Sequence, residues 1–303
     1  ITSKSGMRKK KIGVRLFKGF LLTILALCII GCIGGVVIIK RVIDNAPEIT
    51  PESIKPQGYT STVLADDGAT QTATFVMAGA NRVYVTIDEI PKNLQNAFIA
   101  IEDSRFYEHN GIDLQGILRA GLVGITSGDF SEGASTLTQQ LIKNNVFPNF
   151  TNEKTFFDSL ERKLQEQYLA VQLEKNSGMS KEDTKKLIIT NYLNTINLGN
   201  NTLGVKVAAK RYFNKDVSDL TLSECTVLAS ITKNPSRLNP ISGRENNAER
   251  RRIVLQYMYE QGYITKAQQE EALADDVYDR IQNVDTAAKG TNSHYSYFTD
   301  ELI

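Results

Sequence analysis

The sequence predicts a mainly α-helical domain that follows a short β segment and an N-terminal transmembrane helix. Three observations support this fold class: a long uncharged run near the N-terminus, short β-favouring runs after it, and apolar residues recurring near period 3.6 from Pro91 onward. The chain has 303 residues, of which 41% are hydrophobic, and a net charge of +1. Those totals exclude a disordered or collagen-like chain.

The uncharged run covers residues 19–39. At about 1.5 Å per residue, it is long enough for a bilayer core of roughly 30 Å. Six cations lie within residues 8–18, so the positive-inside rule predicts a cytoplasmic N-terminus and places residues 42–303 outside. A cleavable signal peptide is the alternative, but its apolar region is shorter and no A-x-A site follows here. We therefore expect an uncleaved anchor.

Charge and cysteine usage narrow the partners and the compartment. Residues 1–41 hold nine of the 35 basic residues and no acid, which leaves 26 bases beside all 34 acids in the outer part. A nucleic-acid binder would carry its cations on the folded domain, so no nucleic-acid partner is expected. Cys28 and Cys32 lie inside the apolar run, and Cys225 stands alone outside it. We expect Cys225 to be a small buried residue without a disulfide.

The outer part is organised as a stalk, a β segment and a series of helices. Residues 44–58 contain three prolines and predict a stalk. Within residues 59–90, turn signals separate three short β-favouring runs at residues 60–68, 72–78 and 82–87. Helical periodicity then predicts helices over residues 91–103, 113–125, 135–145, 153–175, 180–197, 204–213, 221–232 and 247–260.

A first candidate site is the run EDSRFYEHNGID, residues 102–113, at the end of an apolar helix. Apolar surroundings disfavour the charged form of a carboxylate, which suits Glu102 as a general base. A solvated helix end is an equally simple interpretation. A metal site is the weaker idea, because the spacing around His109 matches no zinc pattern.

Two further clusters carry polar groups at helical spacing. Thr136 and Gln139 fit a capping box, so they predict a helix start, and the same helix N-terminus with Lys143 two turns on could receive an anion. On the helix expected at residues 153–175, Arg162 and Glu166 lie four residues apart on a face that continues into Leu169 and Leu173. The opposite face carries an apolar stripe formed by Phe157, Leu160, Leu164, Tyr168 and Val171. We expect that helix to be covered on both sides and the ion pair to line a cleft. An exposed pair would contribute only about 0.3–0.5 kcal/mol.

Five blocks in order resemble glycosyltransferase family 51, the peptidoglycan glycosyltransferases. They are EDSRFYEHNGID, GASTLTQQLIKN, RKLQEQYLAVQLE, NYLNTINLGNNTLGVKVAAKRYFNK and LTLSECTVLASITKNPSRLNP. The resemblance covers roughly residues 59–275, and SHYSYFTDELI resembles the lead-in to the transpeptidase domain of class A penicillin-binding proteins. We therefore interpret the chain as the N-terminal part of such a protein.

The resemblance implies roles for individual residues. Glu102 matches the family's catalytic base, Glu166 its second functional glutamate, and Asp103 the acid beside the base. Five further residues match family positions that contact the substrate's pyrophosphate or line the donor site. They are Ser135, Gln139, Lys143, Arg162 and Lys163.

The implied fold is lysozyme-like, with two helical lobes and a long cleft. The implied reaction polymerises lipid II into β-1,4 glycan strands by inverting transfer, with release of undecaprenyl pyrophosphate. No cofactor is required, although a divalent cation at the pyrophosphate is compatible with the resemblance. The expected partners are lipid II, the growing strand, the lipid bilayer of the bacterial cell membrane and the cell-wall synthesis machinery.

Two other functions would use some of the same residues. A lysozyme-like muramidase would also use a carboxylate in a helical cleft, but hydrolysis needs an acid for a poor leaving group and gains nothing from nearby cations. A non-catalytic membrane scaffold would not need the Glu102/Glu166 pair. Ser230 and Lys233 match a Ser-x-x-Lys pattern of penicillin-reactive enzymes, which we interpret as an accident because no Ser-x-Asn occurs in the chain.

The expected units follow from these observations. They are a cytoplasmic basic tail (1–18), a transmembrane anchor (19–41), a stalk and short β segment (42–90), a glycosyltransferase domain (91–275) and a linker (276–303) toward a transpeptidase domain that this chain does not contain.

Overall fold

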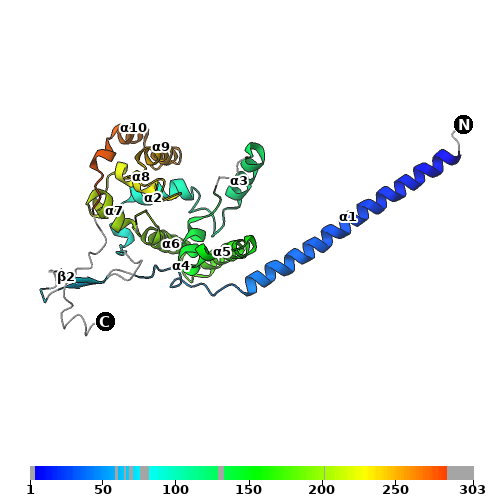
Figure 1. Ribbon diagram of the computed structural model, residues 1–303, viewed down its shortest axis with the longest axis horizontal. Coiled ribbons are helices and arrows are strands. Elements are labelled where there is room, and N and C mark those ends of the chain that lie inside the picture. The colour runs from blue at the N-terminus through cyan, green and yellow to red at the C-terminus, as the bar shows by residue number, and fades with distance from the viewer. Residues whose placement is uncertain are drawn as a thin grey trace.

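The computed structural model describes residues 4–58, 61–64, 66–67, 71–75, 82–128, 133–200 and 202–284. Its first element is one long helix, α1 (Lys4–Asp44), which projects from the rest of the molecule in Figure 1. Within the segment Phe17–Asp44, an 18-residue stretch reaches a mean hydropathy of 2.9 and is not buried, so the helix is long and apolar enough to cross a membrane. The end of α1 lies against α5 (Phe156–Asn176), where the Gln165 amide donates a 3.1 Å hydrogen bond to the Val42 carbonyl.

The segment between α1 and the helical domain packs more closely than a stalk would. Ile54 is fully buried, and the side-chain amide of Asn145 donates a 2.6 Å hydrogen bond to the Ile54 carbonyl. Residues around Ile54 therefore belong to the domain surface, in contrast to the free stalk that the prolines predict. The apolar Ile54 side chain outweighs the proline-rich composition of its neighbours because its burial removes apolar surface from water.

The predicted β segment consists of two short antiparallel strands, β1 (Ser61–Leu64) and β2 (Gln71–Phe75), in which Ser61 pairs with Phe75. The third β-favouring run, residues 82–87, forms no strand. A side chain replaces the missing strand partner: the Asn194 amide accepts from the Val85 N–H and donates to the Val85 carbonyl, both at 2.9 Å. The buried backbone of Val85 is thereby satisfied without a sheet.

The helical domain confirms the predicted fold class. Its helices are α2 (Lys92–Glu102), α3 (Leu114–Ser127), α4 (Leu137–Val146), α5, α6 (Lys181–Thr195), α7 (Val205–Phe213), α8 (Leu222–Ala229), α9 (Arg244–Glu260) and α10 (Lys266–Ala274). Their short turns are η1 (Ile87–Glu89), η2 (Phe150–Asn152), η3 (Val217–Asp219) and η4 (Val277–Arg280). Helix α10 lies beyond the predicted helices; it is mostly polar, and a Thr265–Gln268 capping box marks its start.

The helices pack in two groups, which Figure 1 shows on either side of the domain. Helix α2 packs against α8 and α9, and α10 packs against α9; on the other side α4 packs against both α5 and α6. Helices α6 and α8 both contact α7, which joins the groups. In the second group a buried ion pair links two helices, with Lys185 Nζ 2.7 Å from Glu174 Oε2. The Thr138 hydroxyl donates to the same carboxylate, which ties α4 into the pair.

The expected linker at the end of the chain begins as part of the domain. Val277 is fully buried, and the backbone N–H groups of Gln282 and Val284 donate to carbonyls of α7 at 2.7 and 3.1 Å. Residues 285–303, including the run SHYSYFTDELI, lie outside the described residues. The boundaries of the expected units stay a prediction.

Candidate active site

Glu102 lies between the two helix groups. It is the last residue of α2, whose apolar residues are buried in the core, so the helix delivers the carboxylate to the edge of that core. Three side chains surround it: Gln140 on α4 donates to Oε2 at 2.9 Å, Thr232 after α8 donates to Oε1, and Arg250 Nη2 on α9 lies 3.7 Å from Oε1. The Glu102 side chain is 14% exposed, so it retains access to solvent.

A buried tyrosine fixes the orientation of the Gln140 amide. The hydroxyl of Tyr192, a fully buried residue of α6, donates to Gln140 Oε1 at 3.3 Å. Burial, and to a smaller extent the charges of Glu102 and Asp103, raises the pKa of Tyr192 well above its ordinary value, so the hydroxyl keeps its proton. With its oxygen occupied, Gln140 presents its N–H to Glu102.

Asp103 supports the site from behind. Its side chain is 2% exposed, and it accepts a 3.0 Å hydrogen bond from the Leu137 N–H at the start of α4. The imidazole of His109 lies 2.9 Å from the other carboxylate oxygen. Asp103 therefore joins the end of α2 to the beginning of α4 and holds Glu102 and Gln140 at a fixed separation.

The loop that follows Asp103 packs directly on α5. Gly111 has φ +88°, and a Cβ there would lie 2.4 Å from the Ala170 carbonyl carbon and oxygen. Only glycine permits this approach. The Thr136 hydroxyl and the Gln139 amide both donate to the Gly111 carbonyl, at 2.7 and 3.4 Å. Thr136 also accepts from the Gln139 N–H, which confirms the predicted helix start, but the reciprocal bond of the predicted capping box, from the Thr136 N–H to the Gln139 side chain, does not form.

A second group of charges gathers around Glu166 on α5. The Glu166 side chain is 1% exposed, and its two oxygens pair with Arg162 and with Lys163, the latter at 3.3 Å. Lys163 Nζ also donates to Ser135 Oγ at 2.6 Å, and Arg162 pairs with Glu153 as well. Glu166 thus orients two cations, and their pairing offsets the cost of its burial.

Lys143 connects the two groups of charges. It lies one helical turn after Gln140 on the same face of α4, and its charge interacts with both Glu166 and Glu102. Burial is the main cause that lowers the pKa of Lys143, and the positive charges of Lys163 and Arg162 lower it further. Its ammonium lies 5.1 Å from the centre of the Phe150 ring.

The structure therefore brings most of the predicted residues together. Lys143, Arg162, Lys163, Ser135 and Glu166 form one cluster, and Lys143 lies near enough to Glu102 to interact with it electrostatically. Gln139 and Asp103 differ, since both are buried and bind protein groups. Their assignment to the substrate stays a prediction.

Three neighbours of Glu102 were not predicted from the sequence: Gln140, Thr232 and Arg250. For Gln140 a signal existed, because the helix start at Thr136 fixes which face of α4 each residue occupies. Thr232 and Arg250 are separated from Glu102 by more than a hundred residues, and no local pattern links them.

The prediction for α5 is correct in its second half only. Leu169 and Leu173 are 1% exposed, as expected, but Phe157 is 77% exposed and Leu160 is 43% exposed. The exposed part of the predicted apolar stripe therefore lies in the first turns of α5. Helix α5 is also the helix that contacts α1. These side chains form an apolar surface and are not covered by the domain.

The remaining candidates are structural. Ser230 is fully buried, and its hydroxyl donates to the Thr226 carbonyl at 2.6 Å, as expected of a helix end. Cys225 is fully buried, which confirms the prediction for it, and burial raises its pKa. Within the described residues, no group of three or more histidine, cysteine or acidic side chains is arranged to hold a metal ion.

A carboxylate beside a cation cluster, in a helical domain behind an apolar anchor-length helix, is the arrangement that transfer of a group from an anionic leaving group requires. More particularly, the chain belongs to the transglycosylase family: the family model described as Transglycosylase matches residues 68–259.

Curated relatives agree with this family. Penicillin-binding protein 1A/1B of Bacillus subtilis is 36% identical over 303 residues, which cover 99% of this chain and 31% of the relative. Penicillin-binding protein 1A of Aquifex aeolicus is 44% identical over 192 residues, covering 63% of this chain and 25% of the relative. The chain therefore spans under a third of the length of either relative. A crystal structure of penicillin-binding protein 1A from Haemophilus influenzae aligns with 77% of this chain and 22% of its own, at 20% identity and a TM-score of 0.40.

Proposed function

We propose that this chain is a peptidoglycan glycosyltransferase that polymerises lipid II into β-1,4 glycan strands. The observation that carries the proposal is the arrangement of Glu102 and the cation cluster around Lys143, one helical turn beyond the Gln140 that binds Glu102. A base for the attacking hydroxyl and positive charge for an anionic leaving group are the two requirements of this transfer.

The reaction is a single inverting displacement. Glu102 takes the proton of the 4-hydroxyl of the acceptor GlcNAc, and that oxygen forms a bond to C1 of the donor MurNAc. The bond between C1 and the pyrophosphate oxygen breaks, and undecaprenyl pyrophosphate leaves with the electron pair. Lys143, Arg162 and Lys163 stabilise the charge that develops on the leaving group, and Glu166 orients the last two.

Hydrolysis by a muramidase mechanism fits the site less well. That reaction needs a carboxylic acid to protonate the leaving oxygen. Glu166 is the buried carboxylate of the cluster, and both its oxygens are already paired with cations, so neither is free to contact a leaving oxygen. We propose no required cofactor, because three cationic side chains supply the positive charge; a divalent cation at the pyrophosphate would add to them.

We further propose that the domain contacts the outer surface of the cell membrane and that α1 crosses it with its N-terminus in the cytoplasm. The charge distribution of the sequence supports the orientation. On α3, four large apolar side chains repeat along one face and are 64–75% exposed: Leu114, Leu118, Leu122 and Ile125. Figure 1 shows α3 apart from the other helices, on the side toward which α1 extends. An exposed stripe of this kind is typical of a membrane or partner surface.

The direct test is incubation of the full chain with labelled lipid II, followed by gel separation of the products. A ladder of lipid-linked glycan polymers supports the proposal. Disaccharide products from added glycan, with no polymer from lipid II, would favour the muramidase instead, and no change in either substrate would favour a scaffold.

A further inference from the structure

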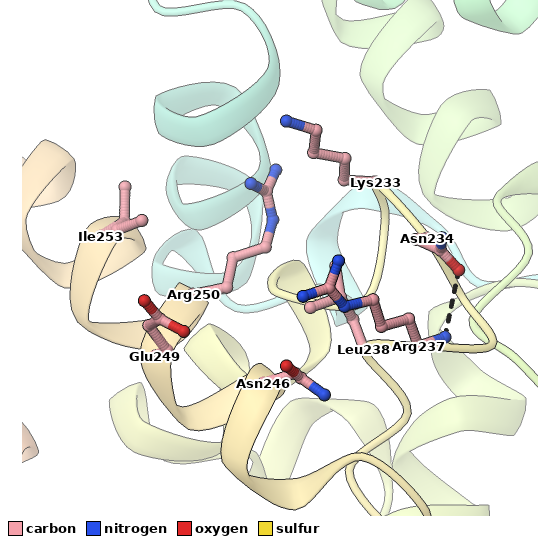
Figure 2. A pocket seen from close by; sticks show the side chains of 8 residues that line it. All are labelled: Lys233, Asn234, Arg237, Leu238, Asn246, Glu249, Arg250 and Ile253. Carbon is pink, nitrogen blue, oxygen red and sulfur yellow. Dashed lines mark hydrogen bonds between the residues drawn. The ribbon is translucent and has the colours of Figure 1, made fainter. Parts of the chain in front are cut away.

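A pocket of about 380 Å³ lies beside Glu102, between α9 and the segment that joins α8 to α9. Figure 2 shows the charged ends of Lys233, Arg237 and Arg250 turned toward the same opening. Arg250 connects this pocket to the active site, because its Nη2 lies 3.7 Å from Glu102 Oε1. Arg250 approaches Oε1 of Glu102, whereas Gln140 on α4 donates to Oε2, and neither Gln140 nor any residue of the cation cluster lines the pocket.

The pocket carries an excess of positive charge. Three cations line it and Glu249 is the one acid among its lining residues. Lys233 and Arg237 are exposed, and neither forms an ion pair with any carboxylate in the part of the chain that the structure describes. An arginine fork and a lysine ammonium without protein partners are suited to an oxyanion ligand.

The wall that presents these cations is preformed. The Asn234 side chain accepts a 3.0 Å hydrogen bond from the Arg237 N–H, drawn as a dashed line in Figure 2, and the Leu238 N–H donates to the Asn234 carbonyl. Next in the segment, the buried Asn239 amide donates to the Tyr212 hydroxyl at 3.2 Å. Because this backbone is already ordered, a ligand would bind without a large entropic cost of ordering it.

We propose that this pocket binds a carboxylate of the peptide that the substrate carries on its MurNAc. The proposal rests on the proposed function, since it names a contact of the same substrate. Asn246 and Ile253 line the pocket beside the cations and offer an amide and an apolar surface; a peptide can use both, whereas a pyrophosphate can use only the amide. Glu249 opposes a multiply charged pyrophosphate more strongly than a single carboxylate.

The test compares two forms of lipid II, one with free peptide carboxylates and one with those carboxylates converted to primary amides. The full chain, the variants Arg237→Gln and Lys233→Gln, and the control Arg252→Gln are assayed for kcat/KM. Arg252 is an exposed arginine of α9 that does not line the pocket. We expect the wild-type chain and Arg252→Gln to prefer the carboxylate form about tenfold, and Arg237→Gln and Lys233→Gln to lose most of that preference.

Other outcomes would overturn the proposal. If Arg237→Gln lowers kcat/KM equally on both forms of lipid II, the pocket binds a pyrophosphate instead. If the wild-type chain shows no preference between the two forms, the pocket does not bind the peptide carboxylate. A binding measurement separates this proposal from the proposed function: calorimetry with soluble GlcNAc–MurNAc-peptide, which has no phosphate. Weaker binding by Arg237→Gln than by Arg252→Gln supports the pocket even if no polymer forms, and equal binding contradicts it.

Discussion

Gln140 donates a 2.9 Å hydrogen bond from Nε2 to Oε2 of Glu102, which joins α4 to the end of α2. The amide cannot turn away easily, because the buried Tyr192 hydroxyl donates to its oxygen. This contact holds the expected base toward one side of the site, while Thr232 holds its other oxygen. Gln140 is thus a positioning residue for Glu102.

Replacement of Gln140 by leucine should therefore lower kcat more than it changes KM. A hydrogen bond to a charged group contributes about 1.5–3 kcal/mol, so we expect a loss of roughly 10–100-fold. Steady-state kinetics with lipid II measures both constants. An unchanged kcat at unchanged Tm would show that Gln140 does not position the base.

The lowered pKa of Lys143 predicts the alkaline behaviour of the enzyme. A lysine is charged below its pKa, so the positive charge of Lys143 is present at neutral pH and is lost as pH rises through a value below the ordinary 10.5. The rate constant kcat/KM, which reports the free enzyme, should fall over that range. In Lys143→Arg the charge persists, and the alkaline decline should move to higher pH. Identical alkaline limbs in the two proteins would contradict this role.

Stability should depend on Gly111 far more than on Gly128. Both have positive φ, but a Cβ on Gly111 would lie 2.4 Å from the Ala170 backbone, whereas nothing lies within 4 Å of a Cβ on Gly128. We expect Gly128→Ala to cost about 1–2 kcal/mol from backbone strain alone, and Gly111→Ala to cost clearly more because α5 must shift. Denaturant unfolding measures both, and equal costs would show that the loop does not need its close approach to α5.

Helix α3 should bind lipid without help from α1. A protein that lacks residues 1–41 should float with liposomes, and the pair Leu118→Glu and Leu122→Glu should abolish flotation, because charge on that face cannot enter the interface. The same pair of substitutions should leave the Tm nearly unchanged, since both side chains are exposed. A truncated protein that stays entirely in the aqueous fraction would contradict the membrane contact.

The sequence predicted elements and charged clusters better than it predicted contacts between them. Helix positions followed from periodicity and caps, as at Thr136, because those signals are local. Residues 82–87 do not form the expected strand. The side chain of Asn194, on a helix far away in the sequence, takes the place of a strand partner by binding the backbone of Val85.

The sequence predicted only part of the site, because local signals do not encode contacts between distant segments. Arg162 and Glu166 are four residues apart, so their pairing could be anticipated from helix geometry. Arg250 reaches Glu102 only because α9 packs on α2, a tertiary contact that no local pattern encodes. The exposure of Phe157 likewise depends on which part of α5 other helices cover, which is again a tertiary property.

In the proposed mechanism Glu102 is the base of the transfer, and the turnover of lipid II by Glu102→Gln measures that role. The glutamine keeps the size and an acceptor oxygen for its neighbours, so the fold and lipid II binding should persist. Glu108→Gln, an exposed position in the same block, is the matched control and should behave as the wild type. Loss of a general base lowers rates by about 10²–10⁴, which is the decrease we predict for Glu102→Gln. More than a tenth of wild-type turnover in a folded, substrate-binding Glu102→Gln protein would contradict the account.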